Sequence, residues 1–394
     1  MDGIMNPLCN QVWSLRDLVD EQVENSFLNE QLYEALPISN CFDIRKIILT
    51  GAGDSYVAAI AMKQVFEKYV DAMLGVDAPD LMNFNRYTTA ADIGIGEPNS
   101  PLVVGISAGG STSRVVETLA KANELGGYSL ALTNNADSVV AQEAKVKVVT
   151  NTPSIDKDFP GLRSYFANLI TLAAIASRLG HVRGVIGPED SQIWKDTIKD
   201  HVYKVFEDLE AIDQVMNDLA KEWKSFTRFD FIGDGPALAS AMFGQYKLYE
   251  CVGEVAYSDD SEDWCHINYF VKNPETVGTV VYAYSDQPSF SRLQETIWSA
   301  LQIGRPVLVI TDDKTLIDPR ATIIELPEPP AEFTWLRPIV DFIPVSLLVG
   351  YISDHGSKRY FNSYNLDTYE VEPHDNMVGQ DKMTIANSKI DYYL

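Results

Sequence analysis

The chain has 394 residues, of which 46% are hydrophobic and 22% charged, so roughly two or three globular domains are expected. Its net charge of −25 excludes binding of nucleic acid or an anionic membrane through the overall field, although local amides and hydroxyls could still hold a small phosphate. We find no signal peptide, no apolar run near the ~20 residues of a membrane span and no C-x-x-C pair among the four cysteines, which predicts a cytoplasmic protein without a metal site or disulfides.

Residues 1–40 form an acidic segment that is predicted to be helical. A buried strand is then expected at residues 47–50, followed by the turn Gly51-Ala52-Gly53-Asp54-Ser55 and an alanine-rich helix. A dinucleotide-binding fold is the rival interpretation of this G-x-G turn. That fold needs a small residue at position 56, where the chain has Tyr56, so the dinucleotide interpretation is disfavoured.

The next strand, at residues 103–106, leads into the hydroxyl-rich loop Ser107-Ala108-Gly109-Gly110-Ser111-Thr112 and a second helix. Ligands of parallel α/β sheets bind at the carboxyl ends of the strands, where glycines let the backbone approach and free amides and hydroxyls can surround a phosphate. An ordinary helix N-cap is the alternative interpretation, but Ser55 on the neighbouring turn favours phosphate. The predicted phosphate-binding residues are Gly53, Ser55, Ser107, Gly109, Gly110, Ser111 and Thr112.

The second half of the chain repeats the first. The pattern S-x5-S-R-x2-E-T begins at Ser107 and again at Ser285, which lies 178 positions later (285 − 107). The strand end at residues 131–135 recurs at residues 309–313 with the same offset. Several landmarks at one offset indicate an internal duplication of about half the chain.

The duplication predicts an α/β protein with two tandem lobes, each a mostly parallel, flavodoxin-like sheet flanked by helices. In the second half, a strand and a G-x-G turn at residues 229–235 precede a helix at about 237–251. The repeated loop at residues 286–290 has no glycine and gains an acid, so only the first lobe is expected to bind phosphate. The predicted segments are a helical segment at 1–40, a first lobe at 41–190, a second lobe at 191–362 and a tail over the active site at 363–394.

The first turn and the hydroxyl-rich loop resemble the G-x-G-T/S-S and S-x-S-G-x-T motifs of the double sugar-isomerase (SIS) domain. That domain occurs in the isomerase part of glutamine–fructose-6-phosphate transaminase and in related deaminases and fructosamine-6-phosphate deglycases, and the resemblance covers nearly the whole chain. Three positions, Asp54, Ala108 and Gly109, depart from the motifs and leave fewer hydroxyl donors. The residues that the resemblance implies for holding a sugar phosphate are Ser55, Ser107 and Thr112, with Gly110 as the pattern glycine.

The same resemblance assigns chemistry to the second half. The family's K-L-x-E helix motif is matched by Lys247-Leu248-Tyr249-Glu250, and its histidine by His266, 16 residues further on (266 − 250). A lysine near the family's C-terminus is matched by Lys389. The Gly-Pro pair that follows the family's histidine is missing here, and the acid three residues before it is shortened to Asp263.

In this family pattern, Glu250 would move a proton between C1 and C2 and His266 would open the sugar ring, acting in a partner subunit. Lys247 would keep Glu250 ionised or stabilise an enediolate oxygen, and Lys389 would form a Schiff base or cap the pocket. From the residues alone, Lys247 and Glu250 are more typical of a surface ion pair than of a catalytic pair. Lys389 is equally typical of a solvated lysine in a tail.

The expected function is a phosphosugar isomerase or deaminase that acts on an amino-sugar or sugar–amine adduct 6-phosphate, of the glucosamine 6-phosphate or fructosamine 6-phosphate class. No glutaminase domain, cofactor or metal is expected. The expected assembly is a homodimer or higher homo-oligomer with the active site near the subunit interface. A simple aldose–ketose sugar-phosphate isomerase and a non-catalytic phosphosugar sensor are the alternatives.

Overall fold

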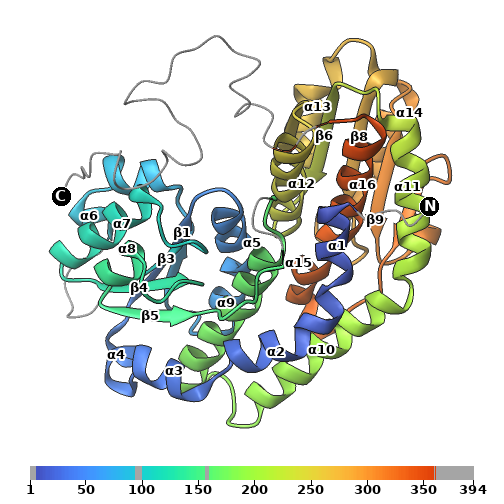
Figure 1. Cartoon of the computed structure of the whole chain (residues 1–394). Coiled ribbons are helices and arrows are strands. Elements are labelled where there is room, and N and C mark those ends of the chain that lie inside the picture. Colours follow the sequence, from blue (N-terminus) through green and yellow to red (C-terminus); the bar gives the residue numbers. More distant parts are fainter. Residues whose placement is uncertain (1–5, 94–99, 156–158, 359, 361–394) are drawn as a thin grey trace. The chain divides into compact units, whose positions relative to one another are not determined.

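The computed structural model describes residues 6–93, 100–155, 159–358 and 360, and it divides into two compact units (Figure 1). The first lobe consists of the described residues within 18–153 and 163–199. The second lobe consists of the described residues within 1–17, 154–162 and 200–360. The first helix, α1 (Pro7–Trp13), therefore belongs to the second lobe, where it packs against α16 (Phe342–His355).

The first lobe is built on a five-stranded parallel sheet in the order β2-β1-β3-β4-β5. Its inner strands are runs of buried residues, as expected for strands that are covered on both faces. The connections β1–α5–β2 and β3–α7–β4 step in opposite directions along the sheet, so right-handed crossovers put α5 and α7 on opposite faces. The strands are β1 (Lys46–Gly51), β2 (Gly75–Asp77), β3 (Leu102–Ile106), β4 (Tyr128–Thr133) and β5 (Val146–Val149). The helices are α2 (Leu15–Ser26), α3 (Asn29–Ala35), α4 (Ile38–Asp43), α5 (Asp54–Tyr69), η1 (Asn83–Tyr87), α6 (Ala90–Ile93), α7 (Ser113–Glu124), α8 (Val139–Glu143), α9 (Arg163–Val182) and α10 (Asp190–Glu207), with α2 and α10 each running between the two lobes.

The second lobe has a five-stranded parallel sheet in the order β7-β6-β8-β9-β10. Position by position this is the strand order of the first sheet, so the predicted α/β class with two tandem parallel lobes is confirmed. The strands are β6 (Arg228–Gly233), β7 (Val255–Asp259), β8 (Val277–Tyr282), β9 (Val307–Thr311) and β10 (Thr322–Glu325). The remaining helices are α11 (Leu209–Trp223), α12 (Ala237–Cys251), α13 (Ser261–His266), η2 (Asn268–Phe270), η3 (Pro274–Thr276), α14 (Phe290–Gln302), η4 (Lys314–Leu316), η5 (Ala331–Leu336) and α15 (Arg337–Val340).

Two successive residues of β6 show which helices cover each face of the second sheet. Phe231 packs against α12 and α16, because a Cβ on Gly244 would lie 2.7 Å from the Phe231 ring and 3.1 Å from Val345. The next residue, Ile232, lies instead in a core cluster with Trp264 of α13 and with α14. Since successive strand residues point to opposite faces, α12 and α16 cover one face, and α13 and α14 cover the other.

One helical stretch, Ala331–His355, is long and apolar enough to cross a membrane by length and composition alone. However, 94% of its apolar window is buried inside the protein. It packs against α1, α11 and α12, so it is the central core helix of the second lobe.

Candidate functional site

Two loops of the first lobe lie side by side at the carboxyl end of its sheet. The ends of β1 and β3 pair in register, with Gly51 opposite Ile106, and each strand runs into a loop and a helix. A Cβ on Gly51 would lie 2.7 Å from Ser55 Cβ and 3.0 Å from the Ile106 carbonyl oxygen. Gly53 has a φ of 56°, a left-handed conformation that favours glycine. The turn therefore brings the start of α5 close against the end of β3, next to Ser107.

The Ser107–Thr112 loop is held in shape by its own hydrogen bonds. The Gly110 N–H donates to the Ser107 carbonyl oxygen at 3.0 Å and lies 3.2 Å from Ser107 Oγ. Gly110 has a φ of 72°, and a Cβ there would lie 2.1 Å from Ser138 Oγ. Ser138 caps α8 by accepting a hydrogen bond from the Ala141 N–H. Only glycine fits at position 110, so the conformation of the loop depends on it.

The helices that follow these two loops begin without a side-chain cap. Gly53 precedes α5 and has no side chain, and Thr112 precedes α7 without a capping hydrogen bond. Thr112 Oγ1 lies instead 3.1 Å from Ser107 Oγ. First-turn amides of two helices and the hydroxyls of Ser55, Ser107 and Thr112 thus lie at one edge of the sheet, which suits an anion. The two remaining predicted positions of the loop, both exposed, are Gly109 and Ser111.

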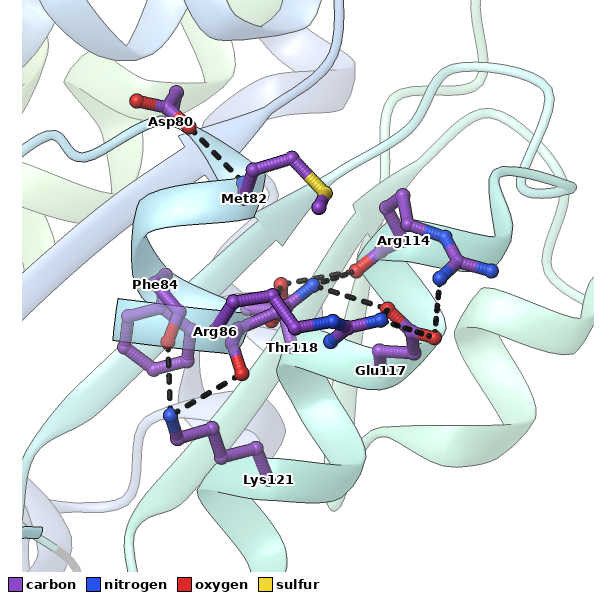
Figure 2. Close-up of polar contacts among 9 residues, drawn as sticks. Asp80, Met82, Phe84, Arg86, Arg114, Glu117, Thr118 and Lys121 are labelled. Atoms are coloured by element: carbon purple, nitrogen blue, oxygen red, sulfur yellow. Dashed lines mark hydrogen bonds and ion pairs between the residues drawn. The ribbon is translucent and has the colours of Figure 1, made fainter. Parts of the chain in front are cut away.

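A buried polar cluster anchors α7 behind the Ser107–Thr112 loop (Figure 2). Glu117 is fully buried, and its carboxylate lies 3.0 Å from Arg86 Nη2 and 2.5 Å from Arg114 Nη1. Lys121, also fully buried, donates to the Phe84 carbonyl oxygen at 2.9 Å. These contacts tie the π-helical segment η1 to α7, as Figure 2 shows. The cluster contains three cations and one carboxylate, so it adds positive charge beside the loop of a chain whose net charge is −25.

The matching loop of the second lobe is occupied by the protein's own charges. The Ser285 N–H and hydroxyl donate to the Asp312 carboxylate at 2.8 and 3.1 Å. Arg337 binds the same carboxylate at 2.8 Å and that of Asp286 at 2.5 Å. Although α14 also begins without a side-chain cap, two carboxylates stand beside this loop, and negative charge there disfavours a phosphate. The prediction that only the first lobe binds phosphate stays a prediction.

The predicted pair Lys247 and Glu250 lies in the last turns of α12. The Lys247 side chain is fully buried, 5.1 Å from the centre of the Phe243 ring, and its Nζ lies 2.6 Å from Glu250 Oε2. The Glu250 side chain is 34% exposed. An ion pair between two solvated side chains was the alternative from the sequence, and it is wrong, because the ammonium group is buried and therefore depends on a partner.

His266 lies apart from this pair. It ends α13, on the opposite face of the sheet from α12, and its side chain is 66% exposed. Its Nε2 lies 2.8 Å from Glu262 Oε1, while Glu262 Oε2 lies 2.8 Å from Arg292 Nε. The His266 contact, followed by the charge of Arg292, lowers the pKa of Glu262. The structure therefore does not bring Glu250 and His266 together within one chain, and Lys389 falls outside the described residues.

Three aspartates meet at the end of β7. Carboxylate oxygens of Asp259, Asp260 and Asp263 lie within 4.8 Å of one another. Asp260 caps α13 by accepting hydrogen bonds from the Glu262 and Asp263 amides. Burial, and then the charges of Asp260, Asp263 and Asp230, raises the pKa of Asp259. The expectation that the protein holds no metal stays a prediction.

Two arginines that organise these loops were not predicted from the sequence. Arg86 lies on the π-helical turn η1, and Arg337 begins a short helix 25 residues after Asp312. No spacing links either arginine to its carboxylate. Glu117 had one usable signal, because the repeated S-R-x2-E-T pattern places it three residues after Arg114 on a helix, where the two side chains can pair.

Comparisons with known proteins agree with this architecture. A family model described as SIS domain matches residues 98–178. Glutamine–fructose-6-phosphate aminotransferase (isomerizing) from Thermococcus kodakarensis is 23% identical over 313 residues, which cover 78% of this chain and 49% of that protein. The chain spans about half the length, or less, of the curated relatives it matches.

Solved structures show the same fold over nearly the whole chain. The C-terminal domain of glucosamine-fructose-6-phosphate aminotransferase from Francisella tularensis has a TM-score of 0.76 at 16% identity, covering 91% of this chain and 98% of that one. Glucosamine-6-phosphate deaminase from Thermotoga maritima has a TM-score of 0.59 at 14% identity, covering 87% and 95%. Both likenesses extend over the two lobes rather than one.

Proposed function

We propose that the chain, whose residues 98–178 match the SIS-domain model and whose two lobes share one strand order, is a SIS-domain phosphosugar isomerase or deaminase. Its substrate is an amino-sugar or sugar–amine adduct 6-phosphate, of the glucosamine 6-phosphate or fructosamine 6-phosphate class. The similarity to the isomerizing part of an aminotransferase and to a deaminase supports this substrate class. The four cysteines, all of them among the described residues, form no disulfide, in keeping with a reaction in the cytoplasm.

The main support for this proposal is the pair of loops that follow β1 and β3 in the first lobe, which together suit an anion. The hydroxyls of Ser55, Ser107 and Thr112 and the uncapped starts of α5 and α7 bind the 6-phosphate. Because Gly53, Gly109 and Gly110 have no side chain, the backbone can approach the phosphate oxygens. Ser111 adds an exposed hydroxyl. The ion pairs of Glu117 with Arg86 and Arg114 hold the start of α7 in position behind the phosphate.

The chemistry belongs to Glu250, with Lys247 as its partner. Glu250 moves a proton between C1 and C2 of the opened sugar, from C2 to C1 for glucosamine 6-phosphate and from C1 to C2 for a fructosamine 6-phosphate, and Lys247 stabilises the enediolate oxygen or its nitrogen equivalent. For glucosamine 6-phosphate, water then adds to the C2 imine and ammonia leaves, giving the ketose phosphate. For a fructosamine 6-phosphate, water adds to the C1 imine and the amine leaves, giving the aldose phosphate. Lys389 closes the pocket or forms a Schiff base with the ketose.

His266 opens the sugar ring in the active site of a partner subunit. Within one chain, α12 and α13 lie on opposite faces of the second sheet, so His266 and Glu250 do not share a site. A homodimer with a two-fold interface can supply each site with a histidine from the other chain. The proposal therefore includes a homodimer or a higher homo-oligomer.

Product analysis tests the reaction. We expect ammonia release from glucosamine 6-phosphate or amine release from a fructosamine 6-phosphate, and a loss of at least about 100-fold in kcat for Glu250→Gln with sugar-phosphate binding retained. The matched control is Glu254→Gln, three residues beyond α12. Interconversion of aldose and ketose phosphates without amine release would favour the simple isomerase. Tight binding without turnover of any of these substrates would favour the sensor and contradict the proposal.

Mixing two inactive variants tests the shared site. Glu250→Gln and His266→Asn proteins are each expected to be inactive as homodimers. If the subunits exchange, half of the dimers are mixed and each carries one intact site, so about a quarter of the wild-type activity returns. Mixed dimers that form but stay inactive would place His266 outside the partner's site.

A further inference from the structure

A small cavity lies in the first lobe, far from the two loops described above. Its volume is about 100 Å³. It lies near the C-terminal end of α9, where Gly180 approaches the carbonyl oxygen of Tyr69 at the last residue of α5. Because α5 begins at the phosphate loops and spans 16 residues, about 24 Å at 1.5 Å per residue, the cavity and the loops lie at opposite edges of the sheet. Its polar lining includes Tyr33, Ser177, Arg178, His181 and Ser191.

Arg178 provides a fixed cation in this cavity. Its Nε and Nη2 both donate to the Leu36 carbonyl oxygen, at 3.1 and 3.0 Å, and its guanidinium lies 4.2 Å from the centre of the Tyr33 ring. These contacts use two of its five N–H donors and orient the planar group. Within the described part of the chain, no carboxylate pairs with Arg178 and none lines the cavity.

Three further polar groups line the same space. Ser177 is 2% exposed and lines the cavity. Ser191 and His181 add a second hydroxyl and an imidazole from α10 and the last turn of α9. A hydroxyl that lines a cavity can donate a hydrogen bond to an anion that occupies it.

We infer that this cavity is a second anion site, which holds a single phosphate group, either free or carried by a small ester. The guanidinium of Arg178 presents parallel donors to two phosphate oxygens, and the hydroxyl of Ser177 donates to a third. The cavity accommodates about one such group, and Phe27, Leu32 and Ala174 leave an apolar wall for a short carbon chain. This site is independent of the sugar phosphate at the opposite edge of the sheet.

Calorimetric titration of inorganic phosphate into the full chain tests the site. The double variant Ser107→Ala/Thr112→Val weakens the loop site, so the binding that remains reports on the cavity. Adding Arg178→Gln to this background is expected to weaken the remaining binding at least about tenfold. Lys147→Gln is the matched control, since it removes one cation of the same lobe that lies outside the cavity and donates to the Ala136 carbonyl oxygen. Tighter binding of glycerol 3-phosphate than of phosphate identifies an ester as the occupant, and the reverse identifies free phosphate.

A second variant tests the site independently, in case Arg178→Gln does not fold. Ser177→Val fills the cavity with methyl groups and leaves the arginine in place, so it is expected to weaken phosphate binding with an unchanged circular dichroism spectrum. Phosphate binding by folded Ser177→Val, or by Arg178→Gln, as tight as that of Lys147→Gln would overturn the assignment. If the loops themselves bind no phosphate, the double variant titrates like the wild type while Arg178→Gln still loses binding, so failure of the proposed function remains distinguishable.

Discussion

The two lobes place the same arginine–glutamate pair at the start of the same helix and use it differently. In the first lobe, Arg114 Nη1 lies 2.5 Å from Glu117, whose fully buried carboxylate also binds Arg86. In the second lobe, Arg292 Nη1 lies 2.9 Å from Glu295, whose side chain is 68% exposed. The same motif therefore forms a buried ion pair that anchors a helix in the first lobe, and an exposed ion pair in the second. The burial of the glutamate, which the motif sequence does not determine, decides its role.

The loops that precede these helices differ in the same sense. Ser107 faces Thr112, whereas Ser285 is bound by Asp312, which Arg337 holds in turn, and neither α7 nor α14 begins with a side-chain cap. Among the described residues, no carboxylate binds Ser107. In the second arrangement, an anion would compete with two carboxylates for Arg337. The duplication thus produced two equivalent loops at the carboxyl ends of the two sheets. In the second loop, charged side chains of the protein bind one another.

Glu117→Gln is expected to give the largest effect on stability. It leaves Arg86 and Arg114 without the carboxylate that they share, and breaking a buried pair costs about 3–5 kcal/mol. The matched variant, Glu295→Gln, removes an exposed partner and should change stability by less than about 0.5 kcal/mol. Urea unfolding of both proteins measures the difference. Equal losses would mean that burial does not distinguish the two pairs.

Gly110→Ala is expected to destabilise the first lobe by about 3 kcal/mol, because it combines a φ of 72° with a clash against Ser138. Its neighbour provides the control. Gly109 is exposed, and a Cβ there would meet no atom within 4 Å, so Gly109→Ala should cost less than about 0.5 kcal/mol. Thermal unfolding monitored by circular dichroism separates the two variants. A stable Gly110→Ala protein would show that the loop has another accessible conformation.

Much of the fold followed from local chemistry in the sequence. The repeated S-x5-S-R-x2-E-T pattern and the two G-x-G turns predicted two parallel sheets and the loops at their carboxyl ends, because each motif consists of neighbours in the chain. The internal bonds of the Ser107–Thr112 loop are equally local, since its serine and threonine are five residues apart.

The rest depends on contacts between distant residues, which periodicity does not encode. Arg86 reaches Glu117 from a segment 31 residues away, and Arg337 reaches Asp286 across 51 residues. The 16-residue spacing from Glu250 to His266 (266 − 250) does not reveal that the intervening strand β7 takes the chain to the other face of the sheet. The burial of Lys247 has the same origin, because packing of α12 on the sheet decides it.

Asp341 makes the stability of the second lobe depend on pH. The residue is buried, accepting hydrogen bonds from Ser240 at 2.6 Å and from Tyr284 at 3.2 Å. Burial raises its pKa from 3.8 to about 7, although these bonds and the charge of Arg337 oppose the rise. The folded protein therefore keeps a proton that the unfolded chain releases near its ordinary pKa. The Asp341 contribution to stability falls as the pH rises from about 4 to about 7 and is constant above that.

Asp341→Asn removes this contribution, so the variant should gain roughly 3 kcal/mol relative to the wild type between pH 5 and pH 8. The wild-type curve alone is not diagnostic, because His201 in the same lobe works in the opposite direction. Burial, then the charges of Lys204 and Arg337, lowers its pKa to about 4, so its contribution is lost as the pH falls from about 6.5 to about 4. Urea unfolding of both proteins at pH 5 and pH 8 isolates Asp341. A stability difference that does not change with pH would show that Asp341 is ionised throughout.

Ser107→Ala and Ser285→Ala test the comparison of the lobes at the ligand itself. Ser107 loses a hydroxyl that faces the uncapped start of α7, so binding of a sugar 6-phosphate should weaken about tenfold, equivalent to ~1.4 kcal/mol. Ser285 loses a hydroxyl that is bound to Asp312, so the same substitution should leave the affinity unchanged. Titration of glucosamine 6-phosphate into the two variants measures both effects. Equal weakening would mean that the second edge also takes part in binding, and that the Asp312–Arg337 pair opens to admit the phosphate.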